Sequence, residues 1–191
     1  MDSMRRLILC LLAICCTLEL VAQETTSTPI ADSRPIKEFL SSFTAIDVDA
    51  PIILTLTRIS NNEAPYIIYD TKGVYTSKFT AEVDRKSGTL KISERNDPKR
   101  ESVTEVKVFF SELTDINIAK ADVTIKGTLE SQLLDIYISN DANLVADIDV
   151  LDLMIFASGK SRIILTGSTH YQTANISTAE YDASRLETIS T

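Results

Sequence analysis

The chain has 191 residues, no Trp, one His and three Cys, and the last of the three Cys is Cys16. If the N-terminal segment is removed, the remaining chain has no thiol, which excludes disulfide scaffolds, zinc fingers, iron–sulfur clusters and Cys nucleophiles. With His170 as the one imidazole, sites that need two or three His ligands are excluded as well. The sequence therefore predicts no metal site, no cofactor and no catalytic residues.

Residues 1–22 have the layout of a secretory signal peptide. Two arginines precede an apolar run of about a dozen residues, and the small residue Ala22 precedes polar sequence. The run is shorter than the ~20 residues that a membrane-spanning helix needs. A lipid anchor at Cys15 is the alternative, although Ile14 is bulky where a lipobox has a small residue. We therefore expect an exported protein, located in the periplasm or at the cell surface.

Residues 23–34 are rich in Thr, Ser and Pro, which is typical of a flexible linker. We expect a single domain over residues 35–191, divided into an N-terminal part, 35–110, and a part with internal repeats, 111–191. The formal net charge is −8, and residues 111–191 contain 5 basic and 12 acidic residues. This acidity argues against nucleic-acid partners, which bind through basic residues. No second apolar segment approaches the length of a membrane span, so none is expected in the mature chain.

Residues 43–110 have the two-residue period of β-strands. Short segments rich in Val, Ile and Thr alternate with turn residues, and no amphipathic helix longer than two turns is present. One short helical turn is expected over residues 35–40. The predicted strands cover residues 43–49, 52–59, 65–70, 74–83, 89–93 and 103–110. The predicted fold class is all-β.

Residues 111–191 contain an internal repeat of roughly 20 residues, a period found in solenoid proteins. The equivalent apolar positions recur at this interval and are Ile118, Ile138, Ala157 and Ile176. Several short strands in such a period are typical of a β-solenoid, in which each coil buries its apolar side chains against the next. These four residues should form one row at the strand spacing of ~4.8 Å. A second predicted row consists of Ile116, Ile136 and Ile155. An antiparallel sandwich with strands at the same interval is the alternative.

Several segments resemble the head GIN domain family in sequence and in order. The motifs are SFTAIDV at 42–48, PI at 51–52, LTL at 54–56, GTLKI at 88–92, VKV at 106–108, LTDI at 113–116, FASG at 156–159 and ILTG at 164–167. Members occur mainly in exported proteins of Bacteroidetes and carry the label putative auto-transporter adhesin. The resemblance implies a right-handed parallel β-helix-like domain preceded by a β-rich N-terminal part. It implies no functional residues.

Two features depart from this family. Relatives place Gly-containing bends between coils, whereas this chain keeps only Ser158-Gly159, so we expect Asn140 and Asp141 to adopt the left-handed conformation that Gly would supply. The chain also ends where relatives begin another coil. This predicts either a truncated member of the family or an open C-terminal edge through which the protein self-associates.

The candidate binding residues are polar side chains at equivalent bends of three successive coils. Asp122, Asn143 and Arg162 would form a ladder able to contact sugar hydroxyls. Solvated bend residues without a function are the simpler explanation of the same pattern.

Other chemistry-bearing residues fit simpler explanations. His170 follows Gly167 without a nucleophile motif and is expected in a surface turn. The acidic residues Asp147, Asp149 and Asp152 lack the spacing of known calcium loops and predict a strand whose acids face water. The tyrosines are scattered along the sequence and predict no stacking platform; they are Tyr66, Tyr69, Tyr75, Tyr137, Tyr171 and Tyr181.

Two functions are compatible with these observations. The first is a non-catalytic envelope protein, adhesin-like or scaffolding, that binds a surface glycan or protein through an extended solenoid face. The second is a glycan-active enzyme of the β-helix type, which would need two carboxylates ~5–10 Å apart in a tight pocket. Because no acid/base constellation is evident, the first is favoured.

Overall fold

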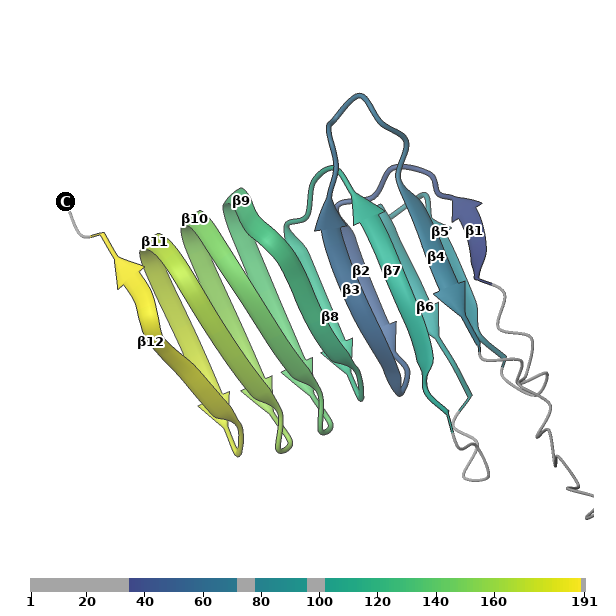
Figure 1. The fold of residues 1–191 in the computed structure, drawn as a ribbon. Helices are drawn as coiled ribbons and strands as arrows, with labels where there is room; N and C mark the ends of the chain where they lie inside the picture. Colours follow the sequence, from purple (N-terminus) through teal and green to yellow (C-terminus); the bar gives the residue numbers. More distant parts are fainter. Residues whose placement is uncertain (1–34, 72–77, 96–101, 190–191) are drawn as a thin grey trace, which may run out of the picture. The chain divides into compact units, whose positions relative to one another are not determined.

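The computed structural model describes residues 35–71, 78–95 and 102–189, and these residues form twelve β-strands (Figure 1). The predicted signal peptide, linker and Cys15 lie outside the described residues. The all-β prediction is confirmed. The strands are β1 (Ile36–Phe39), β2 (Ala45–Asp49), β3 (Ile52–Arg58), β4 (Tyr66–Asp70), β5 (Thr80–Asp84), β6 (Thr89–Ser93), β7 (Thr104–Phe110), β8 (Asp115–Ala119), β9 (Asp122–Ser139), β10 (Asn143–Ser158), β11 (Arg162–Ser177) and β12 (Glu180–Thr188).

The strands belong to one mixed sheet. Its main path runs β1-β4-β7-β3-β9-β8-β2-β6-β5, and β10, β11 and β12 follow β9 in that order. Among the described residues, β1, β4 and β7 pair antiparallel, as do β5 and β6, and the remaining pairings are parallel. Figure 1 shows β8 to β12 following one another along the stack toward the C-terminal end, drawn in yellow.

The N-terminal strands agree with the predicted ones except at the start. Residues 35–40 do not form the expected helical turn, because Ile36–Phe39 pairs antiparallel with β4. Backbone hydrogen bonds to a neighbouring strand satisfy more groups than a single isolated turn, whose nucleation is unfavourable. Of the predicted strand 74–83, the structure describes the part from residue 78 onward, which contains β5.

Segments one repeat apart lie side by side in parallel. Ile118 pairs with Ile138, Ile138 with Ala157, and Ala157 with Ile176. The prediction that Ile118 and Ile138 are neighbours on adjacent parallel strands is therefore confirmed. The second predicted row is confirmed as well: it consists of Ile116, Ile136 and Ile155, each completely buried.

The N-terminal strands extend these rows although they do not share the period. Strand β2 lies between β6 and β8, so Val48 pairs with both Ile92 and Ile118. In chain order, β6 pairs with one edge of β2, and β8 pairs later with its other edge. In the sequence, several other strands separate β2 from β6 and from β8. The number of residues between β2 and β6 differs from the number between β2 and β8, so these pairings leave no periodic pattern in the sequence.

Left-handed backbone at the bends allows the chain to turn from one strand to the next. Asn140 and Asp141 have φ of 55° and 63°, which confirms the expectation that they replace Gly. The equivalent bends contain Lys120 at 64°, Lys160 at 58° and Thr178 at 56°. A β-branched residue is rare in this region because of steric strain. The hydroxyl of Thr178 accepts a hydrogen bond from the Gly159 N–H at 3.1 Å, and this bond links the bend at Thr178 to the neighbouring bend at Gly159.

Gly167 on β11 is required by a close backbone contact with β10. Its φ is 104°, and a Cβ at this position would lie 1.9 Å from the carbonyl oxygen of Ile148 on β10. Gly127 also has a positive φ, of 77°, but a Cβ there would meet nothing within 4 Å. Both glycines therefore have a positive φ, but only at Gly167 would a Cβ overlap with a neighbouring strand.

Replacing each glycine by alanine should separate the cost of left-handed backbone from the cost of steric overlap with a neighbouring strand. Gly127→Ala should lower the free energy of unfolding by about 1–2 kcal/mol, the cost of left-handed backbone. Gly167→Ala should lower it by about 3–5 kcal/mol, because overpacking against the backbone of Ile148 is added. Urea unfolding followed by circular dichroism measures both. Equal losses in the two variants would contradict the packing of β11 on β10.

Candidate functional site

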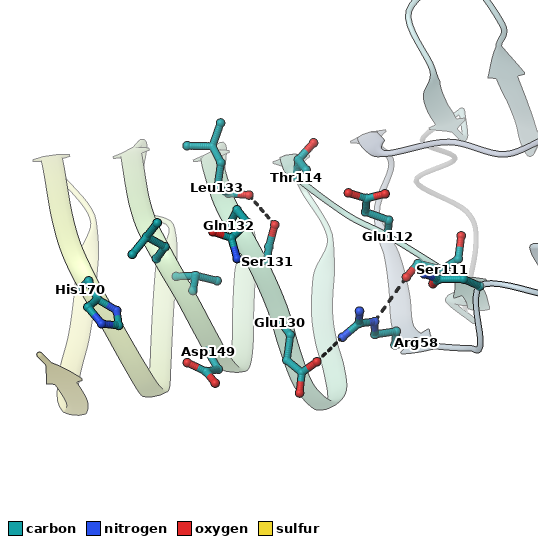
Figure 2. Close-up of a pocket in the computed structure, with 13 residues that line it drawn as sticks. Arg58, Ser111, Glu112, Thr114, Glu130, Ser131, Gln132, Leu133, Asp149 and His170 are labelled. Atoms are coloured by element: carbon teal, nitrogen blue, oxygen red, sulfur yellow. Dashed lines mark hydrogen bonds and ion pairs between the residues drawn. The ribbon is translucent and has the colours of Figure 1, made fainter.

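The structure contains an open groove of about 610 Å³, which we call the Arg58 groove (Figure 2). It crosses β3, β9, β10 and β11 and the segment between β7 and β8. Its lining residues are Arg58, Asn61, Ser111, Glu112, Thr114, Glu130, Ser131, Gln132, Leu133, Asp149, Val150, Leu151 and His170. The sequence carries no signal for this site, because its two sides come from segments that share no motif.

An ion pair joins the two sides of the groove. The Arg58 guanidinium donates to Glu130 Oε2 at 2.8 Å and to the carbonyl oxygen of Ser111 at 3.3 Å. Figure 2 shows Glu130, Asp149 and His170 on successive strands, with Glu130 pointing toward Arg58. Exposed pairs of this kind contribute little to stability, so the pair mainly sets the position of Arg58.

The groove combines carboxylates with exposed apolar side chains. One Arg stands among three carboxylates, those of Glu112, Glu130 and Asp149. Leu133 and Leu151 are 46% and 40% exposed. The lining is therefore acidic overall and partly apolar.

The predicted ladder residues are neighbours on three parallel strands. Asn143 pairs with Asp122 on one side and with Arg162 on the other. The Asn143 amide donates to Asp122 Oδ1 at 2.6 Å, and Arg162 Nε lies 3.4 Å from Glu180 Oε2. The ladder lies at the start of these strands and does not line the Arg58 groove, so its role as a binding site stays a prediction.

The acidic residues of β10 are used in hydrogen bonds between strands. The hydroxyls of Thr128 and Thr166, from β9 and β11, both donate to Asp147, and these bonds hold the pKa of Asp147 below its ordinary value of 3.8. Asp149 accepts a hydrogen bond from Ser168 at 2.8 Å. In the described part of the chain, no group of three His, Cys, Asp or Glu side chains is arranged to hold a metal ion.

His170 lies on β11 rather than in a surface turn, contrary to the sequence-based expectation. The strand continues through residues 167–171 because Gly167 and its neighbours pair with both β10 and β12. His170 is half-buried and lines the Arg58 groove.

The aromatic side chains are not scattered in space, which corrects the sequence-based expectation. Tyr137 and Phe156 occupy equivalent positions of β9 and β10 and stack with ring centroids 5.1 Å apart. A second stacked pair, Tyr66 and Phe109, joins β4 to β7 with centroids 4.2 Å apart. The expectation was wrong because it considered the tyrosines alone, whereas Phe156 lies one repeat after Tyr137.

The pKa of the Asp135 carboxyl group is raised above the ordinary value of 3.8. Burial is the main cause, and the negative charges of Asp115 and Asp152 add to it. Its Oδ1 atom is buried and has no hydrogen-bond partner. The parallel register places Asp115 directly beside Asp135, so two like charges share adjacent strands.

In the described residues, no helix has the length and apolarity that a membrane span requires.

Comparison with known proteins agrees with this architecture. Two crystal structures from Parabacteroides distasonis are similar in fold. One is described as a "putative lipid binding protein", with a TM-score of 0.58 and 16% identity over 81% of this chain and 74% of its own. The other is described as a "putative adhesin", with a TM-score of 0.57 and 15% identity over 82% of this chain and 75% of its own. No curated protein matches the sequence.

The mixed sheet of parallel and antiparallel strands places the molecule among all-β proteins. A family model described as "Putative auto-transporter adhesin, head GIN domain" matches residues 42–191. The chain belongs to this family, as its sequence motifs indicated.

The two perturbed aspartates should respond oppositely to neutralisation. Asp135 has a raised pKa, so its ionisation costs stability as pH rises, and Asp135→Asn should raise Tm at pH 7. Asp147 has a lowered pKa, so its ionised form stabilises the fold, and Asp147→Asn should lower Tm at pH 7. Both differences should fade as pH falls and the carboxyl groups become protonated, and the difference at Asp147, whose pKa is lowered, should persist to lower pH than the difference at Asp135, whose pKa is raised. Thermal unfolding over this pH range is the measurement, and changes of the same sign in both variants would contradict the account.

Proposed function

We propose that this protein is a non-catalytic, exported envelope protein of adhesin type that binds a surface polymer or protein through the Arg58 groove. Membership of the head GIN domain family supports an adhesin-like role. The observation that carries the proposal is the groove itself, an open hollow of about 610 Å³ that crosses several strands. An open groove spanning successive strands fits an extended chain better than a small compact ligand.

The charge and polarity of the groove lining limit the kinds of partner that it can bind. With three carboxylates against Arg58, the groove repels polyanions such as nucleic acids or phosphate-rich polymers. Exposed Leu133 and Leu151 provide apolar contact area near the polar groups. A neutral polysaccharide or a surface protein with neutral or basic segments fits this combination.

A glycan-active enzyme is the second candidate, and Asp135 is the observation in its favour. Its raised pKa and its acidic neighbours, Asp115 and Asp152, are features of catalytic carboxylates. Against this candidate, Asp135 does not line the described hollows around it. The groove carboxylates Glu130 and Asp149 already accept bonds from Arg58 and Ser168. We therefore infer binding without turnover.

We further propose that the parallel repeats form a right-handed β-helix-like solenoid within one domain over residues 35–191. In-register parallel pairing of β8 to β12, each strand beside the one that follows it by one repeat, supports this proposal. Almost all connections between parallel strands are right-handed, which supports the handedness. In the described residues β12 pairs with β11 alone, and self-association along β12 stays a proposal.

A glycan array and a reducing-sugar assay on the full chain test the binding function together. We expect retention of one or more surface polymers and no release of reducing ends. Arg58→Ala and Glu130→Gln should each weaken binding by about tenfold, because the ion pair that positions the groove wall is lost.

Lys86→Ala provides the control, because Lys86 is exposed in the turn between β5 and β6 and does not line the groove. It should bind as the wild type does. Turnover of a glycan that Asp135→Asn abolishes would establish the enzyme instead. Binding that is unchanged in Arg58→Ala and Glu130→Gln would exclude the groove as the binding site.

A further inference from the structure

A second surface lies on the outward face of the sheet, away from the residues of the Arg58 groove. Four outward side chains on adjacent strands form a row that we call the Tyr137 ridge. In order of their strands β8, β9, β10 and β11, they are Asn117, Tyr137, Phe156 and Asn175. Their inward neighbours Ile138 and Ala157 are buried, so the alternation of the strands directs the ridge outward.

The two aromatic rings stand side by side in the middle of the ridge. Their planes differ by 4° and their centroids are 5.1 Å apart, so each ring covers one face of the other. Tyr137 is nevertheless 40% exposed. Asn117 on β8 is the neighbour of Tyr137, and Asn175 on β11 is the neighbour of Phe156.

Hydrogen-bonding groups flank the rings on both sides. Asn117 donates from its amide nitrogen to Asp47 Oδ1 at 2.9 Å, which fixes the amide beside Tyr137. A second outward row follows two residues further along the same strands and consists of Ser139, Ser158 and Ser177. Aromatic faces thus lie between amide and hydroxyl groups at regular strand spacing.

Two hollows adjoin the ridge. One, of about 340 Å³, follows its serine side from Asn117 to Asn175 and includes both rings in its wall. The other, of about 360 Å³, lies between Tyr137 and Asp47 and includes Asn117. The aromatic pair therefore has one hollow along its serine side and a second beside Tyr137, and each has space for a ligand ring.

The charge around the ridge excludes an anionic ligand. Among the described residues that line these two hollows, there is no Lys, Arg or His, whereas Asp47 and Asp115 contribute carboxylates. Phosphate and sulfate groups are normally bound by Arg or Lys, and uronic acids likewise need a cationic partner. The whole chain, with a net charge of −8, adds to this repulsion.

We propose that the Tyr137 ridge is a binding site for an uncharged glycan. The apolar C–H face of a pyranose ring packs on an aromatic face, and its equatorial hydroxyls bond to amide, carboxylate and serine groups around that face. A purely apolar partner would leave the surrounding amides and carboxylates desolvated and unpaired. A chain of neutral sugars can pack on the aromatic faces and also form hydrogen bonds with the polar groups around them. Such a chain would follow the row from Asn117 to Asn175.

This site goes beyond the proposed groove function and stands independently of it. The ridge and the Arg58 groove share no lining residue among those described. Each surface is therefore open to mutation separately, and the failure of one proposal leaves the other intact.

Affinity electrophoresis of the full chain tests the site. Gels containing mannan, β-glucan or dextran supply neutral probes, and gels containing heparin or polygalacturonate supply anionic ones. At least one neutral polysaccharide should retard the wild-type protein, and the anionic polymers should not. Tyr137→Val and Phe156→Val should each lower the affinity for the retarding polymer about tenfold or more, because Val keeps strand propensity while removing the ring.

Three controls separate recognition from stability. Tyr137→Phe keeps the ring and should retain most of the affinity. Tyr171→Ala removes an equally aromatic side chain that is 64% exposed outside the ridge, and Lys86→Ala changes an exposed turn residue that lines neither hollow; both should bind as the wild type does. Circular dichroism verifies the fold of each variant. The proposal is overturned if none of the neutral polymers retards the protein, or if folded Tyr137→Val and Phe156→Val bind as tightly as Tyr171→Ala.

Discussion

The parallel register between segments one repeat apart is the constraint on which the rest of the structure depends. Because a β-ladder aligns each residue with one partner, most side chains lie beside their equivalents on the next strand, and the register shifts only after Val145 in the pairing with β9 and after Ile164 in the pairing with β12. Inward positions are then mostly apolar, as the buried row Ile116, Ile136 and Ile155 illustrates. Outward positions carry no such requirement and are available for recognition.

The same register has opposite electrostatic consequences in different rows. Where Asp115 lies beside Asp135, like charges meet and add to the effect of burial, so the pKa of Asp135 rises. Where Thr128 and Thr166 flank Asp147, the hydroxyls donate to it and its pKa falls. A carboxylate on this surface therefore stabilises or destabilises the fold according to its burial and its two neighbours, which are set by the repeat interval.

The register also explains how surfaces form from residues with no local motif. Tyr137 and Phe156 meet because both occupy the same position in their repeats. The Arg58 groove arises differently, since Arg58 from β3 meets Glu130 from β9. One surface belongs to the repeat and the other to the junction between the repeat and the N-terminal strands.

Sequence analysis predicted those parts of the fold that depend on periodicity. The strand class, the two isoleucine rows and the left-handed Asn140 and Asp141 follow from alternation, repeat spacing and turn chemistry. The position of β2 between β6 and β8 does not, because contacts between segments so far apart in the sequence leave no periodic trace. The groove that depends on this topology was missed for the same reason. The aromatic ridge, by contrast, could have been predicted from the repeat. Because the repeat aligns Ala157 with Ile138, it also aligns the preceding residues, Phe156 and Tyr137.

Disulfide trapping tests the register most directly. With Cys10, Cys15 and Cys16 replaced by serine, cysteines are introduced at Val145 and Ile164, which pair across β10 and β11. The strand spacing of ~4.8 Å is within the range for a disulfide, so Val145→Cys with Ile164→Cys should cross-link under mild oxidation. Val145→Cys with Ile163→Cys should not, because Ile163 is completely buried and faces the core. Cross-linking of the second pair but not the first would contradict the register, and with it the surfaces that depend on it.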